Sequence, residues 1–209
     1  MDKYLRSTYY FDYNETSVQD MVKEFRNLPQ REQISGLFLK VRDGWRYNPY
    51  VIYTKKDKYK ASFLVDQHEG HCVDKSTLFI AGLRALEIPA RLRLAKVVNH
   101  IATEKLTSLL GSNYIAPHGI VEVFSNDQWT KASTAFNQSL CEKYNVAPLY
   151  YDGTEDAMIQ AYTQKDEKYM EYVEDYGHFD DLPFDFIFES FKTNYPQLID
   201  KLKSDKLEI

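Results

Sequence analysis

The segment from residue 72 to residue 86 constrains the fold most, because its apolar residues recur along one stripe of a helix. The stripe and the small residues beside it are Leu78, Phe79, Leu83 and Leu86, then Ala81, Gly82 and Ala85. A helix with this much apolar surface is largely buried, and Pro89 stops it. The rest of the chain must therefore supply a layer that packs against this helix.

The residues that follow this helix carry the alternating pattern of strands. Residues 90–98 alternate arginine with apolar side chains, which predicts one strand. Residues 118–124 and 129–136 alternate in the same way on either side of a turn at Ser125-Asn126-Asp127, which predicts a β-hairpin. Residues 99–117 are expected to form a loop.

Three further helices are expected from helical spacing. Ser17 is the predicted N-cap of the first, with Asp20 as the capping-box acid, and the second should end near Gly44. The third is expected to end before Pro196. The apolar residues of the three helices are, in order, Val18, Met21, Val22 and Phe25; Ile34, Leu37, Phe38 and Val41; Phe184, Ile187, Phe188 and Phe191. The last helix is expected to pack the C-terminal segment onto the core.

Length and charge limit the number of domains and the class of partner. A chain of 209 residues is long enough for one sizeable core, and we expect a single domain over residues 1–209. The formal charge is −5 without a long basic run, so the protein should repel a phosphate backbone. Nucleic acid is therefore not an expected partner.

Location and redox state follow from apolar runs and cysteines. The first residues lack the apolar core of a signal peptide, and no stretch approaches the 18 or so apolar residues of a membrane span, so a cytoplasmic protein without a membrane partner is expected. Cys72 and Cys141 are the two cysteines, which does not predict a disulfide framework.

Cys72 is placed where a cysteine can act as a nucleophile. It follows Gly70 and His71 and begins the buried helix, so unpaired backbone N–H groups and the helix dipole should favour the thiolate and lower the thiol pKa. The same N–H groups can hold an oxyanion. Cys141 lacks this placement and is interpreted as structural.

His118 is the candidate partner of this cysteine. It opens the first strand of the predicted hairpin, and a strand holds a side chain rigidly. Histidine can pair with a thiolate near neutral pH and then protonate a leaving group. Cysteine first and histidine later on a strand is the papain arrangement.

Several ordered blocks of the sequence resemble the transglutaminase-like superfamily. Its core has a helix-starting cysteine, a strand with His-x-x-x-Glu-Val and a strand with tryptophan, which correspond here to Cys72, residues 118–123 and Trp129. Residues 42–47 and 83–91 extend the similarity. The resemblance implies an α+β fold with a papain/transglutaminase-like core at about residues 35–137, its nucleophile helix packed on an antiparallel β-sheet, and a family-specific extension at about residues 138–209.

The third member of the family's catalytic group departs from the pattern. The family usually has an aspartate four residues after the hairpin tryptophan, where this chain has Ser133. If the hairpin closes symmetrically, His118 faces Ala135 and Ser133 lies diagonally beside it on the same face. Ser133 can then orient the imidazole without supplying a negative charge, and a shift of one residue would substitute Thr134.

Other positions remain open as helpers. Asn137 and Asp152 are alternative residues that could orient His118. For the oxyanion, the first candidate is the backbone N–H of Cys72, with the side chains of three residues as possible additional donors: Gln67, Tyr47 and Trp45.

A metal site is the alternative interpretation of the segment around Cys72. His68, Glu69 and His71 crowd next to Cys72, but this spacing matches no common zinc pattern. We expect no metal and no cofactor, and no calcium-loop pattern is seen. The two further histidines, His100 and His178, are expected in surface loops.

The predicted function is thiol-dependent acyl transfer or hydrolysis of an amide bond in a peptide, protein or small amide. Because single-domain members of the superfamily are often peptidases or amidases, the resemblance favours a cysteine hydrolase. The alternatives are a binding module that keeps the fold without activity, which the missing aspartate favours, and a protein-glutamine transferase.

Overall fold

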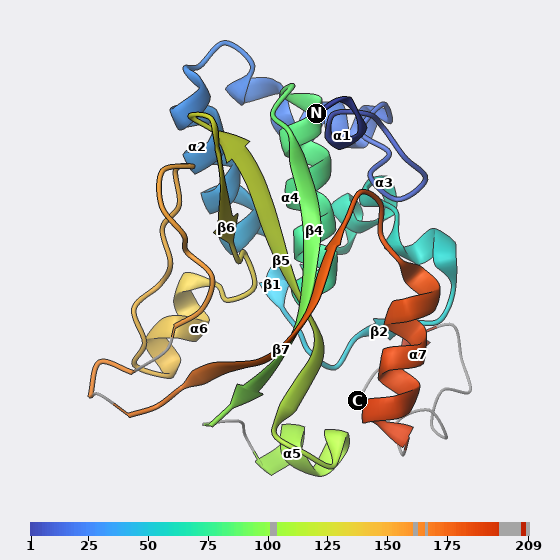
Figure 1. Cartoon of the computed structure of the whole chain (residues 1–209), viewed down its shortest axis with the longest axis vertical. Coiled ribbons are helices and arrows are strands. Elements are labelled where there is room, and N and C mark those ends of the chain that lie inside the picture. The colour runs from blue at the N-terminus through green and yellow to red at the C-terminus, as the bar shows by residue number, and fades with distance from the viewer. Residues whose placement is uncertain (101–103, 161–162, 166, 197–205, 208–209) are drawn as a thin grey trace.

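The computed structural model describes residues 1–100, 104–160, 163–165, 167–196 and 206–207 (Figure 1). Its helices are α1 (Thr16–Val22), α2 (Gln30–Gly44), α3 (Ala61–Leu64), α4 (Cys72–Ala85), α5 (Glu104–Leu110), α6 (Gln138–Lys143) and α7 (Phe184–Asn194). Its strands are β1 (Arg46–Tyr47), β2 (Ile52–Tyr53), β3 (Glu69–Gly70), β4 (Ala90–Asn99), β5 (Tyr114–Ser125), β6 (Gln128–Ala132), β7 (Met170–Phe179) and β8 (Lys206–Leu207). Short 3₁₀ helices are found at Asp2–Tyr4, Lys23–Phe25, Lys56–Tyr59 and Val65–Gln67.

The main sheet is antiparallel, with strand order β6-β5-β4-β7. Helix α4 packs on β5 and β4, with α2 on the same side of the sheet (Figure 1). All residues of α4 are buried, as its apolar stripe predicts. The expected α+β fold, with the nucleophile helix on an antiparallel sheet, is confirmed.

The hairpin of β5 and β6 forms in the predicted register. Ser125 pairs with Gln128 across a turn in which Asn126 and Asp127 both adopt left-handed backbone angles, with φ of 50° and 60°. These two residue types tolerate that conformation better than most. The symmetric closure is therefore correct.

The second strand of the hairpin is shorter than predicted. Pairing stops at Val121 and Ala132, and the chain then leaves the sheet, where the backbone N–H of Ser133 donates to the carbonyl oxygen of Ala157 at 2.9 Å. The extended pattern of residues 133–136 comes from burial in a loop rather than from a strand. Ser133 consequently lies outside the paired region.

Other expectations need correction. The N-cap of α1 is Glu15, without a side-chain cap, while Ser17 lies inside the helix and contacts the carbonyl oxygen of Ser62. The expected loop at 99–117 contains α5 and the start of β5, with residues 101–103 outside the described part. Strand β7, next to β4, was not expected from the sequence, because its burial does not alternate cleanly.

A helix that crosses a membrane must be both long and apolar. Among the helices of the described residues, none has both the length and the apolar character that crossing a bilayer requires.

Candidate active site

The N-terminus of α4 is closed by a reciprocal cap. His71 is the N-cap, and its Nδ1 accepts hydrogen bonds from the backbone N–H groups of Val73 at 3.2 Å and Asp74 at 3.3 Å. In return, the carboxylate of Asp74 accepts the backbone N–H of His71 at 3.0 Å. A Cβ on Gly70 would lie 2.8 Å from Cβ of Asp74, so glycine lets the carboxylate reach back. This cap fixes the first turn, where Cys72 stands.

The sulfur of Cys72 lies at the edge of β5, beyond the point where β6 stops pairing with it. Its Sγ is 3.8 Å from the carbonyl oxygen of Pro117, and the backbone N–H of Gly119 also bonds to it. Backbone groups of alternate residues in a strand point to the same edge, so Pro117 and Gly119 face the direction in which Val121 pairs with β6. The short β6 therefore leaves space for the nucleophile.

Gly119 lets α4 approach β5 this closely. A Cβ at this position would lie 2.9 Å from Oγ of Ser76 and 3.0 Å from both the carbonyl oxygen of Cys72 and Cα of Val73. Two of these three are backbone atoms, which cannot turn aside as a flexible side chain can. Glycine at residue 119 thus sets the distance between the nucleophile and the strand.

Burial determines the charge of Cys72. It raises the pKa of the thiol to about 12, while the backbone N–H groups of Gly119, Val73 and Cys72 itself lower it by less. The helix start therefore acts in the expected direction, but the expected net decrease does not occur because the residue is only 4% exposed. Cys72 is a thiol at neutral pH in this conformation.

His118 is buried beside this site without a hydrogen-bond partner. Both ring nitrogens are enclosed and unbonded, so the imidazole makes no hydrogen bond to Sγ of Cys72. Because Gly119 meets α4, strand alternation places His118 on the opposite face of β5. Burial, with a smaller contribution from His71, lowers the pKa of His118 to about 4. The ring is therefore neutral at pH 7.

Ser133 makes no hydrogen bond to this ring in the structure. Its Oγ accepts only the backbone N–H of Ala135, at 3.4 Å, and no bond joins it to His118. The hydroxyl of Thr134, the alternative after a register shift, is buried and unbonded. The roles predicted for Cys72, His118 and Ser133 remain predictions.

The alternative orienting residues serve other parts of the fold. Asn137 accepts the backbone N–H of Tyr47 at 2.6 Å and donates to the carbonyl oxygens of Arg42 and Trp45. Lys75 donates to the same two oxygens at 2.7 and 2.6 Å, and burial lowers its pKa to about 7. Asn137 and Lys75 thus tie the end of α2 to α4.

Asp152 lies at the surface, where it pairs with Arg31 and accepts the hydroxyl of Thr154 at 2.6 Å. It is therefore not a partner of His118.

The possible oxyanion donors differ in their availability. Nε1 of Trp45 donates to the carbonyl oxygens of Leu64 and Val65, so its one N–H is not free to bind substrate. Nε2 of Gln67 donates one of its two N–H groups to the carbonyl oxygen of Phe63. Tyr47 lines the same pocket as Cys72.

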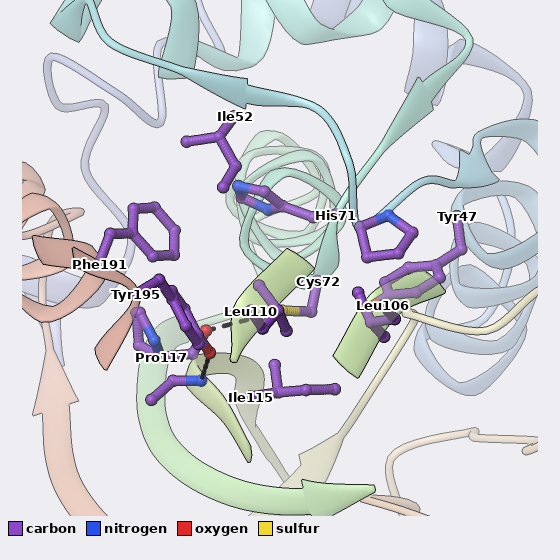
Figure 2. A pocket seen from close by; sticks show the side chains of 12 residues that line it. Tyr47, Ile52, His71, Cys72, Leu106, Leu110, Ile115, Pro117, Phe191 and Tyr195 are labelled. Carbon is purple, nitrogen blue, oxygen red and sulfur yellow. Dashed lines mark hydrogen bonds between the residues drawn. The ribbon is translucent and has the colours of Figure 1, made fainter. Parts of the chain in front are cut away.

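An apolar pocket opens onto Cys72 (Figure 2). Figure 2 shows His71 above the sulfur, with Phe191 and Tyr195 across from Tyr47. Its lining consists of Tyr47, Pro49, Ile52, His71, Cys72, Leu106, Leu110, Ile115, Ala116, Pro117, Phe191 and Tyr195, around an empty volume of about 420 Å³ that includes the open mouth. No Lys, Arg, Asp or Glu side chain is among these described residues. The pocket therefore suits an uncharged group.

Part of this wall comes from the C-terminal segment. The hydroxyl of Tyr195 donates to the carbonyl oxygen of Tyr114 at 3.1 Å and accepts the backbone N–H of Ala116 at 2.5 Å. The apolar stripe predicted α7, but no signal in the sequence placed Phe191 and Tyr195 in one pocket with Cys72. Leu106 and Leu110 of α5 were missed with their helix.

The remaining cysteine and the histidines show no competing site. Cys141 is buried in α6, where the amide of Gln160 donates to its Sγ at 3.6 Å. In the described part of the chain, no three His, Cys, Asp or Glu side chains are grouped so that they could hold a metal ion. Near the surface, His100 lies 3.2 Å from a carboxylate oxygen of Glu171.

Comparison with known proteins identifies the family of this chain. Residues 19–134 match the sequence profile of the Transglutaminase-like superfamily. Among solved structures, one described as a "Putative Cysteine Protease from Cytophaga hutchinsonii" is 14% identical and has a TM-score of 0.47; the match covers 85% of this chain and 46% of that one. No curated protein matches. Because the profile covers more than half of its residues, the chain belongs to the transglutaminase-like superfamily.

Proposed function

We propose that the protein is a cysteine hydrolase that cleaves amide bonds through Cys72 and His118. One observation carries the proposal: Cys72 begins a buried helix and lines an apolar pocket, while a buried histidine without hydrogen bonds follows Pro117, whose carbonyl contacts the sulfur. Buried polar atoms without partners are costly, and sites of function are where such atoms are retained. The family supplies the general class, a cysteine-dependent hydrolase or transferase fold, without a specific activity.

The proposed reaction begins from the neutral pair. A nitrogen of His118 takes the thiol proton as Sγ bonds to the carbonyl carbon, and the carbonyl electrons move to its oxygen. The backbone N–H of Cys72 binds this oxyanion. His118 then gives the proton to the amide nitrogen, the carbon–nitrogen bond breaks, and a thioester remains. Water, deprotonated by His118, releases the carboxylic acid and restores the thiol.

The two groups must approach each other for this reaction. His118 has no hydrogen bond to lose, but it starts on the face of β5 opposite α4, and the Sγ contact with Pro117 must break. Catalytic hydrogen bonds are often formed only in the complex with substrate. Substrate binding in the pocket is the proposed event that brings the sulfur to the imidazole.

The test is hydrolysis of uncharged peptide amides and p-nitrophenyl esters by the full chain. We expect turnover that is lost in Cys72→Ala and His118→Ala and retained in Cys141→Ser. Turnover that survives Cys72→Ala would exclude the proposal, as would absence of Cys72-dependent turnover across both substrate classes.

A second candidate is a non-catalytic binding module. It is favoured by the absence of an acid beside His118 and by the pKa values of about 12 and about 4, which keep both groups neutral. In that case the pocket would bind the same uncharged molecules, and Cys72→Ala would not change their affinity. A transferase would instead need a free amine to release the thioester.

A further inference from the structure

His71 carries its proton on Nε2. Its Nδ1 accepts two backbone N–H groups, those of Val73 and Asp74, at 3.2 and 3.3 Å. A nitrogen that accepts hydrogen bonds in the ring plane cannot also hold a proton there, so the neutral ring is the Nε2–H tautomer. An oxygen of Asp74 lies 3.4 Å from Nδ1 and is engaged by the backbone N–H of His71. The helix cap thus determines which ring atom is a donor.

Within the described part of the chain, the Nε2–H group has no acceptor. His71 is 5% exposed, and its Nε2 is buried without a hydrogen bond. Its ring lies among apolar and aromatic side chains, with ring centroids 6.1 Å from Tyr59 and 6.2 Å from Phe191. A buried donor without an acceptor costs free energy, which a bound oxygen atom would recover.

The ring lines the same pocket as the sulfur of Cys72 (Figure 2). No Lys, Arg, Asp or Glu side chain is among the described residues that line it. A carboxylate or ammonium group would therefore lose its water without gaining a counter-ion, whereas a neutral carbonyl group would not. The acceptor that fits His71 is an uncharged oxygen on a mainly apolar group.

We propose that His71 is a substrate-binding residue whose Nε2–H donates a hydrogen bond to an uncharged carbonyl oxygen of the group that Cys72 attacks. The assignment of this group to a substrate rests on the proposed function. The hydrogen bond itself can be measured without turnover.

Three small thiol reagents probe the pocket in a Cys141→Ser background at pH 9. Iodoacetamide carries a neutral carbonyl oxygen, iodoacetate a charged carboxylate, and allyl bromide no oxygen. The rate with iodoacetamide is divided by the rate with iodoacetate, for Cys72 and for glutathione. We expect this ratio to be at least about tenfold larger for Cys72, since one unpaired charge is costly to bury. An equal preference in Cys72 and glutathione would overturn the neutral-oxygen assignment.

Two substitutions separate the cap from the donor. In His71→Asn, Oδ1 can replace Nδ1 as the cap acceptor, but no atom reaches the position of Nε2. In His71→Gln, the side-chain amide can reach the position of Nε2, but the cap acceptor is lost. We expect the iodoacetamide rate relative to that of allyl bromide to fall about fivefold in the Asn variant, as for one neutral hydrogen bond. The Gln variant should keep at least half of this ratio.

The opposite pattern would contradict the proposal. If the ratio is unchanged in His71→Asn, or falls equally in both variants, Nε2 does not bind the carbonyl. Nitrogen-15 NMR of the wild-type imidazole is the measurement that survives a misfolded variant, and a proton on Nδ1 would overturn the assignment. Failure of the proposed function would appear differently, as a normal rate ratio with no Cys72-dependent hydrolysis.

Discussion

The Sγ atom of Cys72 lies 3.8 Å from the carbonyl oxygen of Pro117, the residue directly before His118. A carbonyl oxygen accepts a hydrogen bond but cannot donate one, so this contact holds the sulfur as a thiol. The structure therefore describes Cys72 in its protonated form, with its sulfur turned to the backbone of the strand that carries His118.

The reactivity of Cys72 should reflect this resting form. Burial raises its pKa to about 12, so alkylation by iodoacetamide in the substrate-free protein should be slower at pH 7 than that of glutathione. The rate should still be rising at pH 10. Mass spectrometry of Cys141→Ser measures it at each pH, and a rate that levels off below pH 8 would show that a thiolate already forms in the resting state.

His118 should make stability depend on pH in the acidic range. Burial lowers its pKa from 6.5 to about 4, so the unfolded chain binds a proton that the folded chain does not. The contribution to stability is complete above pH 6.5 and is lost as the pH falls to about 4, by roughly 3 kcal/mol.

Urea unfolding of the wild type and of His118→Gln at pH 7.5 and pH 4 measures this loss. Glutamine does not titrate, so the variant should lose about 3 kcal/mol less between the two pH values, while the carboxylates affect both chains equally. An identical pH dependence in both chains would show that His118 is not buried in its neutral form.

Gly119→Ala should separate the nucleophile helix from β5. The new Cβ would lie 3.0 Å from two backbone atoms of α4, which gives an expected loss of about 1–3 kcal/mol in unfolding free energy. Gly44→Ala is the matched control, because a Cβ there meets no atom within 4 Å. Faster alkylation of Cys72 in Gly119→Ala alone would confirm the displacement, whereas equal stability of the two variants would contradict it.

Ser133→Ala tests the position where the family usually has an aspartate. The Ser133 hydroxyl accepts one long bond from Ala135, so its removal should cost less than about 1 kcal/mol of stability. Since no bond joins it to His118, hydrolysis of the best amide substrate should change by less than about threefold. A loss comparable to that in His118→Ala would assign Ser133 as the orienting residue after all.

Asn137→Ala should destabilise the fold through the end of α2. The backbone N–H of Tyr47 would lose its acceptor, for an expected loss of about 1–3 kcal/mol in thermal or urea unfolding. Asp152→Ala, the other proposed orienting residue, removes a surface ion pair and should cost less than about 1 kcal/mol. Equal losses would contradict the assignment of Asn137 as the structural one.

Helices and turns that are determined by nearby residues were predicted from local patterns in the sequence. The apolar stripe after Cys72 predicted α4, and the turn at Asn126 and Asp127 predicted the hairpin register. Strand β7 was missed because it is an edge strand with two register shifts against β4, which interrupt the period of two.

The environment of the candidate site could not be predicted in the same way. The pKa of Cys72 depends on its burial, and the pocket beside it is lined by residues distant in the sequence, such as Leu110 and Phe191. The position of Ser133 depends on the bond that pulls its backbone toward Ala157. Both are long-range contacts, so helix-start chemistry alone predicted the wrong pKa direction, and hairpin symmetry alone did not show that the chain leaves the sheet at Ser133.

The hydroxyl of Tyr195 joins the end of α7 to the backbone of β5 beside the nucleophile. Helix α7 lies outside residues 19–134, which match the family profile, yet it forms part of the pocket wall. The stretch that matches the family and the helix that completes the pocket wall are therefore separate parts of the chain. A substitution in α7 would reshape the pocket while leaving Cys72 and β5 unaltered.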